Sequence, residues 1–342
     1  MNISADISND ITAAPPVDTE ALHDHPLSER SRLSALARLN AEELVKAFKL
    51  DQFTSLQGIA TSAVSRPAKR LAVQMMEFDR ISGEQGLAAA GNFVLNQFAR
   101  SVKIMDADRV PATGPLLVVS NHPGMVDAMA LWSGLERRSD LRVIAAEREI
   151  LTLLPGTKQY LLFVPEDGSL TLLLRQAIAH LRRGGSLLTF PAGSIEPDPC
   201  IRASSRELCW SSSVRLFAKA VPDLAVLPAA VGGVISPSAL RNPLVALFKN
   251  QKERDWAAAT LQILLPRYRD TTTRVAFGEP IAASMLRIDA LIERVRSLLD
   301  RVSEEKSAAD DPMAREIMLS FPRKRGYFAI GKTLFGKTRD TN

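Results

Sequence analysis

The chain has 342 residues, of which 46% are hydrophobic and 24% are charged, and its formal net charge is +5. These values are typical of a globular protein with one large or two medium domains, and they exclude a fibrous or wholly disordered chain. The net charge is too small to indicate nucleic acid binding, but it is compatible with attraction to an anionic lipid surface. Cys200 and Cys209 fit neither a disulfide framework nor a metal-ligand pattern, which favours a reducing, cytoplasmic environment.

The two ends of the chain differ from its middle in composition. Residues 1–30 are polar, which predicts a disordered leader, and they lack the basic and apolar regions of a secretory signal. Residues 305–342 form a tail in which basic and aromatic side chains alternate from Phe321 to Arg339, so it is either solvated or in contact with a membrane surface. The most apolar stretch, 224–248, is interrupted by prolines, glycines and Arg241, so we expect no transmembrane helix.

Residues 31–108 have apolar side chains at helical spacing and predict a small helical subdomain packed on the rest of the chain. Asn40 followed by Glu43 has the form of a capping box, which predicts a helix start at Asn40. The last helical segment of this region is expected to run from Glu84 to Met105.

Residues 109–304 alternate between short apolar runs and segments of helical period, and this order predicts an α/β fold. Helices are expected from Ala128, over Leu170–Arg182 and over Arg287–Val302. The expected strands are Leu116–Val119, Leu141–Ala146, Tyr160–Val164, Leu187–Phe190, Ala225–Pro228 and Thr273–Phe277.

The end of the first of these strands carries the strongest chemical signal. His122 follows Asn121, and Pro123 is expected near the first position of the next helix. Asp127 comes five residues after His122, and five residues on a helix turn about 140° past the start, so the two side chains share no helix face. They can meet only if His122 lies on the turn and Asp127 on the first helical turn. A carboxylate on one ring nitrogen would then let the other nitrogen act as a general base.

The stretch from Asn121 to Asp127 resembles the His-x4-Asp motif of the glycerolipid acyltransferases of the lysophosphatidate, or PlsC-like, type. The block Phe190–Pro197 is similar to the Phe-Pro-Glu-Gly-Thr-Arg block of the same family, although Ala192 replaces the Glu and Ile195 replaces the Arg. Glu196 is a nearby carboxylate that could take the place of the missing Glu.

Two further blocks resemble the family, and one departs from it. Val226–Ala230 and Val275–Ile281 agree with the later strand motifs, and the resemblance covers about residues 110–281. In the second block Glu166 stands where the family has an Arg for the phosphate of the acceptor. A compensating cation would be needed for a phosphate acceptor, and the candidates are Arg148, Lys158, Arg175 and Arg206.

The resemblance implies a central mixed sheet flanked by helices, as in glycerol-3-phosphate acyltransferases. It also implies acyl transfer from acyl-CoA or acyl-carrier protein to the hydroxyl of a lysophospholipid or related lysolipid, with neither a metal nor a cofactor. His122 is then the general base, Asp127 orients it, and backbone amides near Gly193 stabilise the oxyanion. The residues that the resemblance assigns to substrate binding are Asn121, Phe190, Pro191, Gly193, Ser194, Glu196 and Pro228.

Two other functions are compatible with parts of the sequence. The altered third block allows a non-catalytic lipid-binding or scaffold protein on the same fold, whereas the intact His122 and Asp127 pair argues against it. A P-loop-like match from Gly331 to Thr338 lacks the following helix that a nucleotide site needs. We expect an enzyme that lies peripherally on the inner face of the cytoplasmic membrane, with no nucleic acid partner.

Overall fold

The structure is a computed structural model, and it describes residues 27–49, 57–165, 170–202, 205, 207–211, 213–304 and 315–318. Most of the predicted leader and the basic, aromatic part of the predicted tail lie outside the described residues. Glu166 and Arg206, which entered the prediction of the acceptor site, lie outside them as well.

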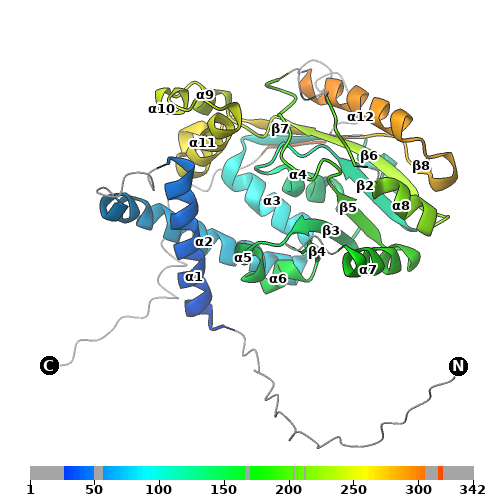
Figure 1. Ribbon diagram of the computed structural model, residues 1–342, viewed down its shortest axis with the longest axis horizontal. Coiled ribbons are helices and arrows are strands. Elements are labelled where there is room, and N and C mark those ends of the chain that lie inside the picture. Colours follow the sequence, from blue (N-terminus) through cyan, green and yellow to red (C-terminus); the bar gives the residue numbers. More distant parts are fainter. Residues whose placement is uncertain are drawn as a thin grey trace, which may run out of the picture.

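A mixed sheet forms the centre of the fold (Figure 1). Within the described residues it has nine strands in the order β4-β3-β5-β2-β6-β7-β1-β9, with β8 paired to β6. The neighbours from β4 to β6 run parallel, whereas β7 and β8 pair antiparallel with β6. The strands are β1 Ser101–Met105, β2 Leu116–Ser120, β3 Leu141–Ala146, β4 Leu161–Val164, β5 Ser186–Thr189, β6 Ala225–Gly232, β7 Thr272–Phe277, β8 Ile281–Ala282 and β9 Arg315–Met318. All six predicted strands are present, and the predicted α/β fold with a mixed sheet is confirmed.

Helices cover both faces of the sheet, because the strand side chains alternate between two apolar cores. Leu116 and Val118 of β2 lie in one core with α3, α4 and α11, while Leu117 and Val119 lie in the other with α7, α8 and α12. The helices are α1 Glu29–Ala47, α2 Gln57–Gln85, α3 Leu87–Phe98, α4 Asp127–Gly134, α5 Glu149–Thr152, α6 Pro155–Lys158, α7 Thr171–Arg182, α8 Ser213–Ala220, α9 Pro237–Leu240, α10 Pro243–Ala246, α11 Gln251–Leu264 and α12 Ile288–Ser303. β2 is therefore buried on both sides, and its carboxyl end is held in a fixed position.

The N-terminal helices differ from the prediction at two points. Asn40 does not begin a helix but lies inside α1, where its amide is buried and donates to Ala68 O; the N-cap is Ser28. The segment expected to be helical up to Met105 ends at Phe98, and Ser101–Met105 forms β1 instead. All residues of this strand except Lys103 are buried, and the strand pairs in parallel with β7, so sheet pairing overrides the helical pattern. The helical region therefore ends earlier than residue 108.

The helical region is joined to the α/β part through Asp79 of α2. This carboxylate pairs with Arg32 of α1 at 2.6 Å and accepts the backbone N–H of Thr157 at 2.8 Å. Arg32 also donates to Leu153 O at 3.0 Å. These contacts fix both helices against the loop between β3 and β4.

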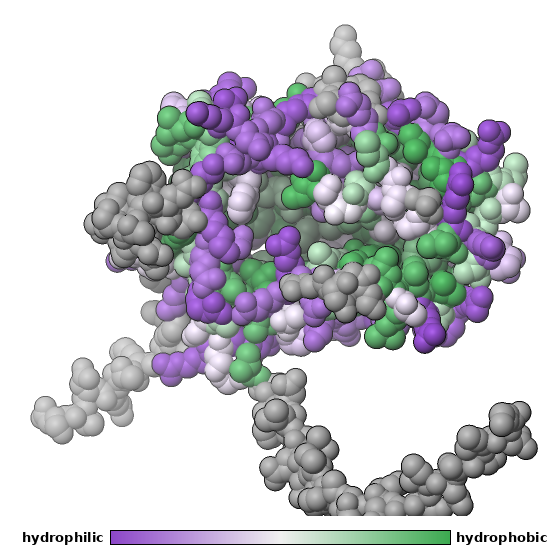
Figure 2. All heavy atoms as spheres, viewed as in Figure 1, coloured by the Kyte–Doolittle hydropathy of each residue, from purple (hydrophilic) through white to green (hydrophobic). Residues whose placement is uncertain are grey.

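The outer surface mixes hydrophilic and hydrophobic residues, and one hydrophobic group lies over α10 at the upper left of the view (Figure 2). Among the described residues, no helix is both long enough and apolar enough to cross a bilayer.

A buried arginine joins the amino ends of three parallel strands. The side chain of Arg138 is 1% exposed, and its guanidinium holds both carboxylate oxygens of Asp140, at 2.9 and 2.8 Å. It also donates to the carbonyls of Pro111, Gly114 and Gly184. These acceptors lie just before β3, β2 and β5, so one planar group sets the relative positions of the three strands.

We expect Arg138→Leu to lower the free energy of unfolding by about 3 kcal/mol, because it leaves three main-chain carbonyls and the partly exposed carboxylate of Asp140 without their buried donor. Arg137→Leu is the matched control: Arg137 is the exposed neighbour, and its loss should change stability by less than about 0.5 kcal/mol. Chemical denaturation of both variants measures the difference. Equal effects of the two substitutions would contradict the role given to Arg138.

Candidate active site

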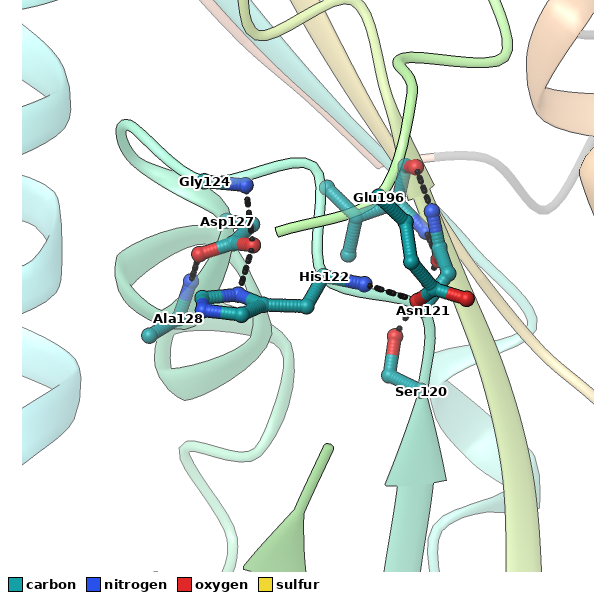
Figure 3. A network of polar contacts seen from close by, with 8 residues as sticks. Ser120, Asn121, His122, Gly124, Asp127, Ala128 and Glu196 are labelled. Carbon is teal, nitrogen blue, oxygen red and sulfur yellow. Dashed lines mark hydrogen bonds and ion pairs between the residues drawn. The ribbon is translucent and has the colours of Figure 1, made fainter. Parts of the chain in front are cut away.

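The site begins where β2 ends, at the carboxyl edge of the parallel strands. Asn121 is 1% exposed, and its side-chain amide donates to Val231 O and accepts the N–H of Val231, both at 2.8 Å. This double contact continues the pairing between β2 and β6 by one residue beyond the strand (Figure 3). The predicted substrate contact of Asn121 does not fit this arrangement, because the side chain is buried and turned toward β6.

His122 and Asp127 meet across a tight turn. Gly124 and Met125 adopt left-handed backbone conformations, with φ of +81° and +59°, and α4 begins at Asp127 rather than near Pro123 as predicted. The turn places His122 Nδ1 2.7 Å from Asp127 Oδ2. The same carboxylate accepts the N–H groups of Gly124 at 2.8 Å and Ala128 at 2.6 Å (Figure 3). His122 therefore lies on the turn and Asp127 on the first helical turn, which is the arrangement that their spacing in the sequence required.

A carboxylate oxygen at this distance is an acceptor for Nδ1–H, so in the neutral imidazole Nδ1 carries the proton and Nε2 does not. The imidazole is 29% exposed and Asp127 is 4% exposed. Burial lowers the pKa of His122, but the hydrogen bond and charge of Asp127 and the charge of Glu196 outweigh it and bring the pKa above its ordinary value. Phe190 stacks on the imidazole with ring centroids 4.4 Å apart, which fixes the ring plane.

Glu196 holds the main chain of the turn from Asn121 to Asp127. Its Oε2 accepts the N–H of His122 at 2.8 Å, and its own N–H donates to His122 O at 2.7 Å. Its Oε1 accepts the indole N–H of Trp210 at 3.1 Å. Burial raises the pKa of Glu196, and these donors oppose the shift. Glu196 thus lies beside His122, but both of its oxygens are engaged with protein groups.

Asp198, which the sequence analysis missed, anchors the same loop to the exit of β6. Its buried carboxylate accepts the N–H of Cys200 at 2.9 Å. It also accepts three consecutive N–H groups, those of Gly233, Val234 and Ile235, at 2.7 to 3.1 Å. The acidic residue between two prolines, Pro197 and Pro199, was the available signal, because a carboxylate in such a loop is suited to accept backbone N–H groups.

The other predicted substrate residues fall into two groups. Pro191 and Pro228 are buried, and Pro228 lies inside β6 between its contacts with β8 and β7, where the strand needs no N–H. Their predicted contacts with substrate do not fit these positions. Gly193 and Ser194 are exposed on the turn after β5. Gly193 has φ +64° and donates its N–H to Phe190 O at 3.1 Å, so this amide is already used within the turn.

Ile195, at the position where the resembling block has Arg, lies over the turn from Asn121 to Asp127. It is 63% exposed, and its side chain is adjacent to Gly124. Lys158 is far from a phosphate at this edge, because it precedes β4 and so lies at the amino end of the sheet. Arg148 follows the carboxyl end of β3, and Arg175 is exposed on α7. Within the described part of the chain, His, Cys, Asp and Glu side chains form no group of three that could hold a metal ion.

A family model described as Acyltransferase matches residues 101–232, a range that includes His122, Asp127, Glu196 and Asp198. Among solved structures, the chain is similar to the 1-acyl-sn-glycerophosphate (LPA) acyltransferase PlsC from Thermotoga maritima, with 17% identity over 81% of this chain and 97% of that chain and a TM-score of 0.38. No curated protein sequence matches the chain. The family model agrees with the resemblance inferred from the sequence motifs, and the agreement extends over residues 101–232.

Proposed function

We propose that the protein transfers a fatty acyl group from a thioester to the hydroxyl of a lysolipid, with His122 as the general base. The observation that carries the proposal is the contact of 2.7 Å between His122 Nδ1 and Asp127 Oδ2 inside the segment that matches the Acyltransferase family model. It leaves Nε2 of a partly exposed imidazole free to accept a proton at the carboxyl edge of the sheet, where open α/β folds bind substrates.

In the proposed reaction the acceptor hydroxyl attacks the thioester directly, without a covalent acyl-enzyme intermediate. Nε2 of His122 takes the proton of the acceptor hydroxyl as its oxygen attacks the thioester carbonyl, and Asp127 stabilises the imidazolium that forms. The tetrahedral intermediate collapses with loss of the thiolate, which receives the proton from His122. The products are an ester and a free thiol. The thioester already carries an activated acyl group, so the step requires neither a metal nor a redox cofactor.

Backbone amides on the turn after β5 are suited to stabilise the oxyanion. The amide of Gly193 is engaged with Phe190, whereas those of Ser194 and Ile195 donate to no group within the described residues. Both residues are exposed on the turn that Glu196 ties to His122. We assign the oxyanion contact to these two amides, with Ser194 and Phe190 as the substrate-facing side chains of the turn.

The acceptor is proposed to be zwitterionic or uncharged near its hydroxyl. Ile195 places an apolar side chain beside the catalytic turn where a phosphate would require a cation. Among the candidate cations, Arg148 follows the carboxyl end of β3, at the same edge of the sheet as His122. It is separated from the turn after β2 by β5, which lies between β3 and β2. The donor is proposed to be acyl-CoA or acyl-carrier protein, and the enzyme to lie peripherally on the inner face of the cytoplasmic membrane.

We expect His122→Ala to reduce transfer by about 10²- to 10⁴-fold without loss of the fold, because the general base is removed. The assay supplies acyl-CoA or acyl-carrier protein with a panel of lysolipids and follows thiol release together with lipid product. His180→Asn is the control, since His180 lies on α7 and bonds to Ser186 O. Retained turnover in His122→Ala would contradict the mechanism. Failure of the wild-type protein on every pair would contradict catalysis and favour a lipid-binding role.

The pH dependence should report the raised pKa of His122. Neutral imidazole is the active form, so kcat/KM should fall as the pH drops through a value above the ordinary 6.5. Asp127→Asn removes the larger of the two carboxylate contributions and should move this acidic limb to lower pH; Glu196→Gln should move it less. Glu207→Gln, an exposed acid, is the control. A limb that stays in place in Asp127→Asn would show that another group titrates.

Ile195→Arg should change the choice of acceptor. A cation beside the catalytic turn should raise kcat/KM for lysophosphatidic acid by about tenfold relative to lysophosphatidylcholine, because a charge-assisted hydrogen bond becomes available. Leu172→Arg is a matched control, because Leu172 is also 63% exposed but lies on α7. An unchanged ratio of the two rates would mean that the acceptor headgroup does not bind at Ile195.

A further inference from the structure

One apolar surface at the edge of the molecule has no role in the proposed reaction. It lies on the adjoining helices α10 and α11, where Leu244, Leu247 and Trp256 are 54%, 77% and 47% exposed, and we call these three side chains the α10 surface. These three side chains come from α10, the residue that follows it and the first half of α11. Figures 1 and 2 show α10 at the outer corner of the molecule, with a hydrophobic group exposed over it.

The exposure of these side chains is built into the local structure. Asn242 caps α10 by accepting the N–H of Leu244 at 2.8 Å, and Asn250 caps α11 by accepting the N–H of Lys252 at 2.9 Å. Val245 lies on the inner side of α10 and is 1% exposed. A capped turn with a buried anchor therefore holds Leu244 and Leu247 outward.

The rim of the α10 surface is basic. Arg241, Lys249 and Lys252 are exposed and form no ion pair with any described residue. The nearby acids are already neutralised, because Glu253 pairs with Lys49 at 2.9 Å and Asp255 pairs with Arg202. The net charge of the rim is therefore positive.

The α10 surface lies at the same end of the sheet as the catalytic turn. β6 ends at Gly232, and α9 and α10 follow within the next fifteen residues. The side chain of Asn121, next to His122, is bonded to Val231 near this end of β6. A flat partner that contacts the α10 surface would thus lie against the end of the molecule that carries the site.

We propose that the α10 surface is a docking site for a bilayer that contains anionic lipids. Leucine side chains that enter the acyl region, a tryptophan at the interface and a rim of lysine and arginine match the three layers of such a membrane surface. A second copy of the chain is a poorer fit, because a symmetric contact would bring two basic rims together. The proposal concerns binding and does not rest on the acyl-transfer activity.

The fluorescence of Trp256 tests the contact in the full chain. Of the three tryptophans, Trp132 is buried and Trp210 is bonded to Glu196, so Trp256 is the exposed reporter. With vesicles of phosphatidylglycerol and phosphatidylcholine that carry bromine on their acyl chains, we expect a blue shift and quenching that are absent in Trp256→Phe. Quenching should be lost with phosphatidylcholine alone. Vesicle binding without quenching of Trp256 would overturn the proposal.

Substitutions on the α10 surface, compared with substitutions at control positions, test which residues contribute to vesicle binding. Leu247→Glu and the double variant Lys249→Glu, Lys252→Glu should each weaken binding to the anionic vesicles by about tenfold or more. Met285→Glu and Arg215→Glu are the controls; Met285 is 76% exposed, and both residues lie toward the opposite end of β6. An equal loss of vesicle binding in the control variants would overturn the proposal. A wild-type dimer that dissociates in Leu247→Glu would also overturn it, because the α10 surface would then be a contact between two copies of the chain. Transfer to a soluble short-chain acceptor should be unchanged in all variants, so a catalytic failure is distinguished from a docking failure.

Discussion

The hydrogen bond between His122 and Asp127 imposes a constraint that the surrounding structure has to meet. Residues five apart cannot face each other on a helix, so the strand must end before His122 and the helix must begin at Asp127. The turn between them needs two left-handed residues, and Gly124 adopts this conformation at no steric cost, whereas Met125 does so under strain. Asp127 offsets part of this cost, because its carboxylate accepts the N–H of Gly124 as well as the imidazole.

The turn is then held from three sides. Asn121 ties it to β6, Phe190 covers the imidazole, and Glu196 binds the main chain of His122. Asp198 fixes the loop that carries Glu196 by accepting backbone N–H groups beyond β6. Most of these contacts join side chains to backbone groups, and they engage the main chain of His122 and the carboxylate of Asp127 but not His122 Nε2. Asn121, Phe190 and Glu196, which the resemblance assigns to substrate binding, thus support the His122 and Asp127 pair.

The sequence predicted the sheet well because strands buried on both faces are short, continuous apolar runs. It failed for Ser101–Met105, where pairing with β7 and β9 decides the conformation, and for Asn40, where burial against α2 replaces a cap. The spacing gave the condition under which His122 and Asp127 can meet, and the resemblance implied that they do. The roles of Asn121 and Pro228 could not be predicted from the sequence. The role of Asn121 depends on β6 being the neighbour of β2, and that of Pro228 on its place in β6 between the residues that pair with β8 and those that pair with β7.

The central claim is that Asp127 holds His122 in one tautomer with Nε2 free to act as a base. Nitrogen-15 NMR of the imidazole measures this state directly in the full chain. The account predicts an Nδ1-protonated ring at high pH that titrates with a pKa above 6.5, and a lower pKa in Asp127→Asn. A proton on Nε2 in the neutral ring, or a pKa that is unaffected by Asp127→Asn, would contradict it.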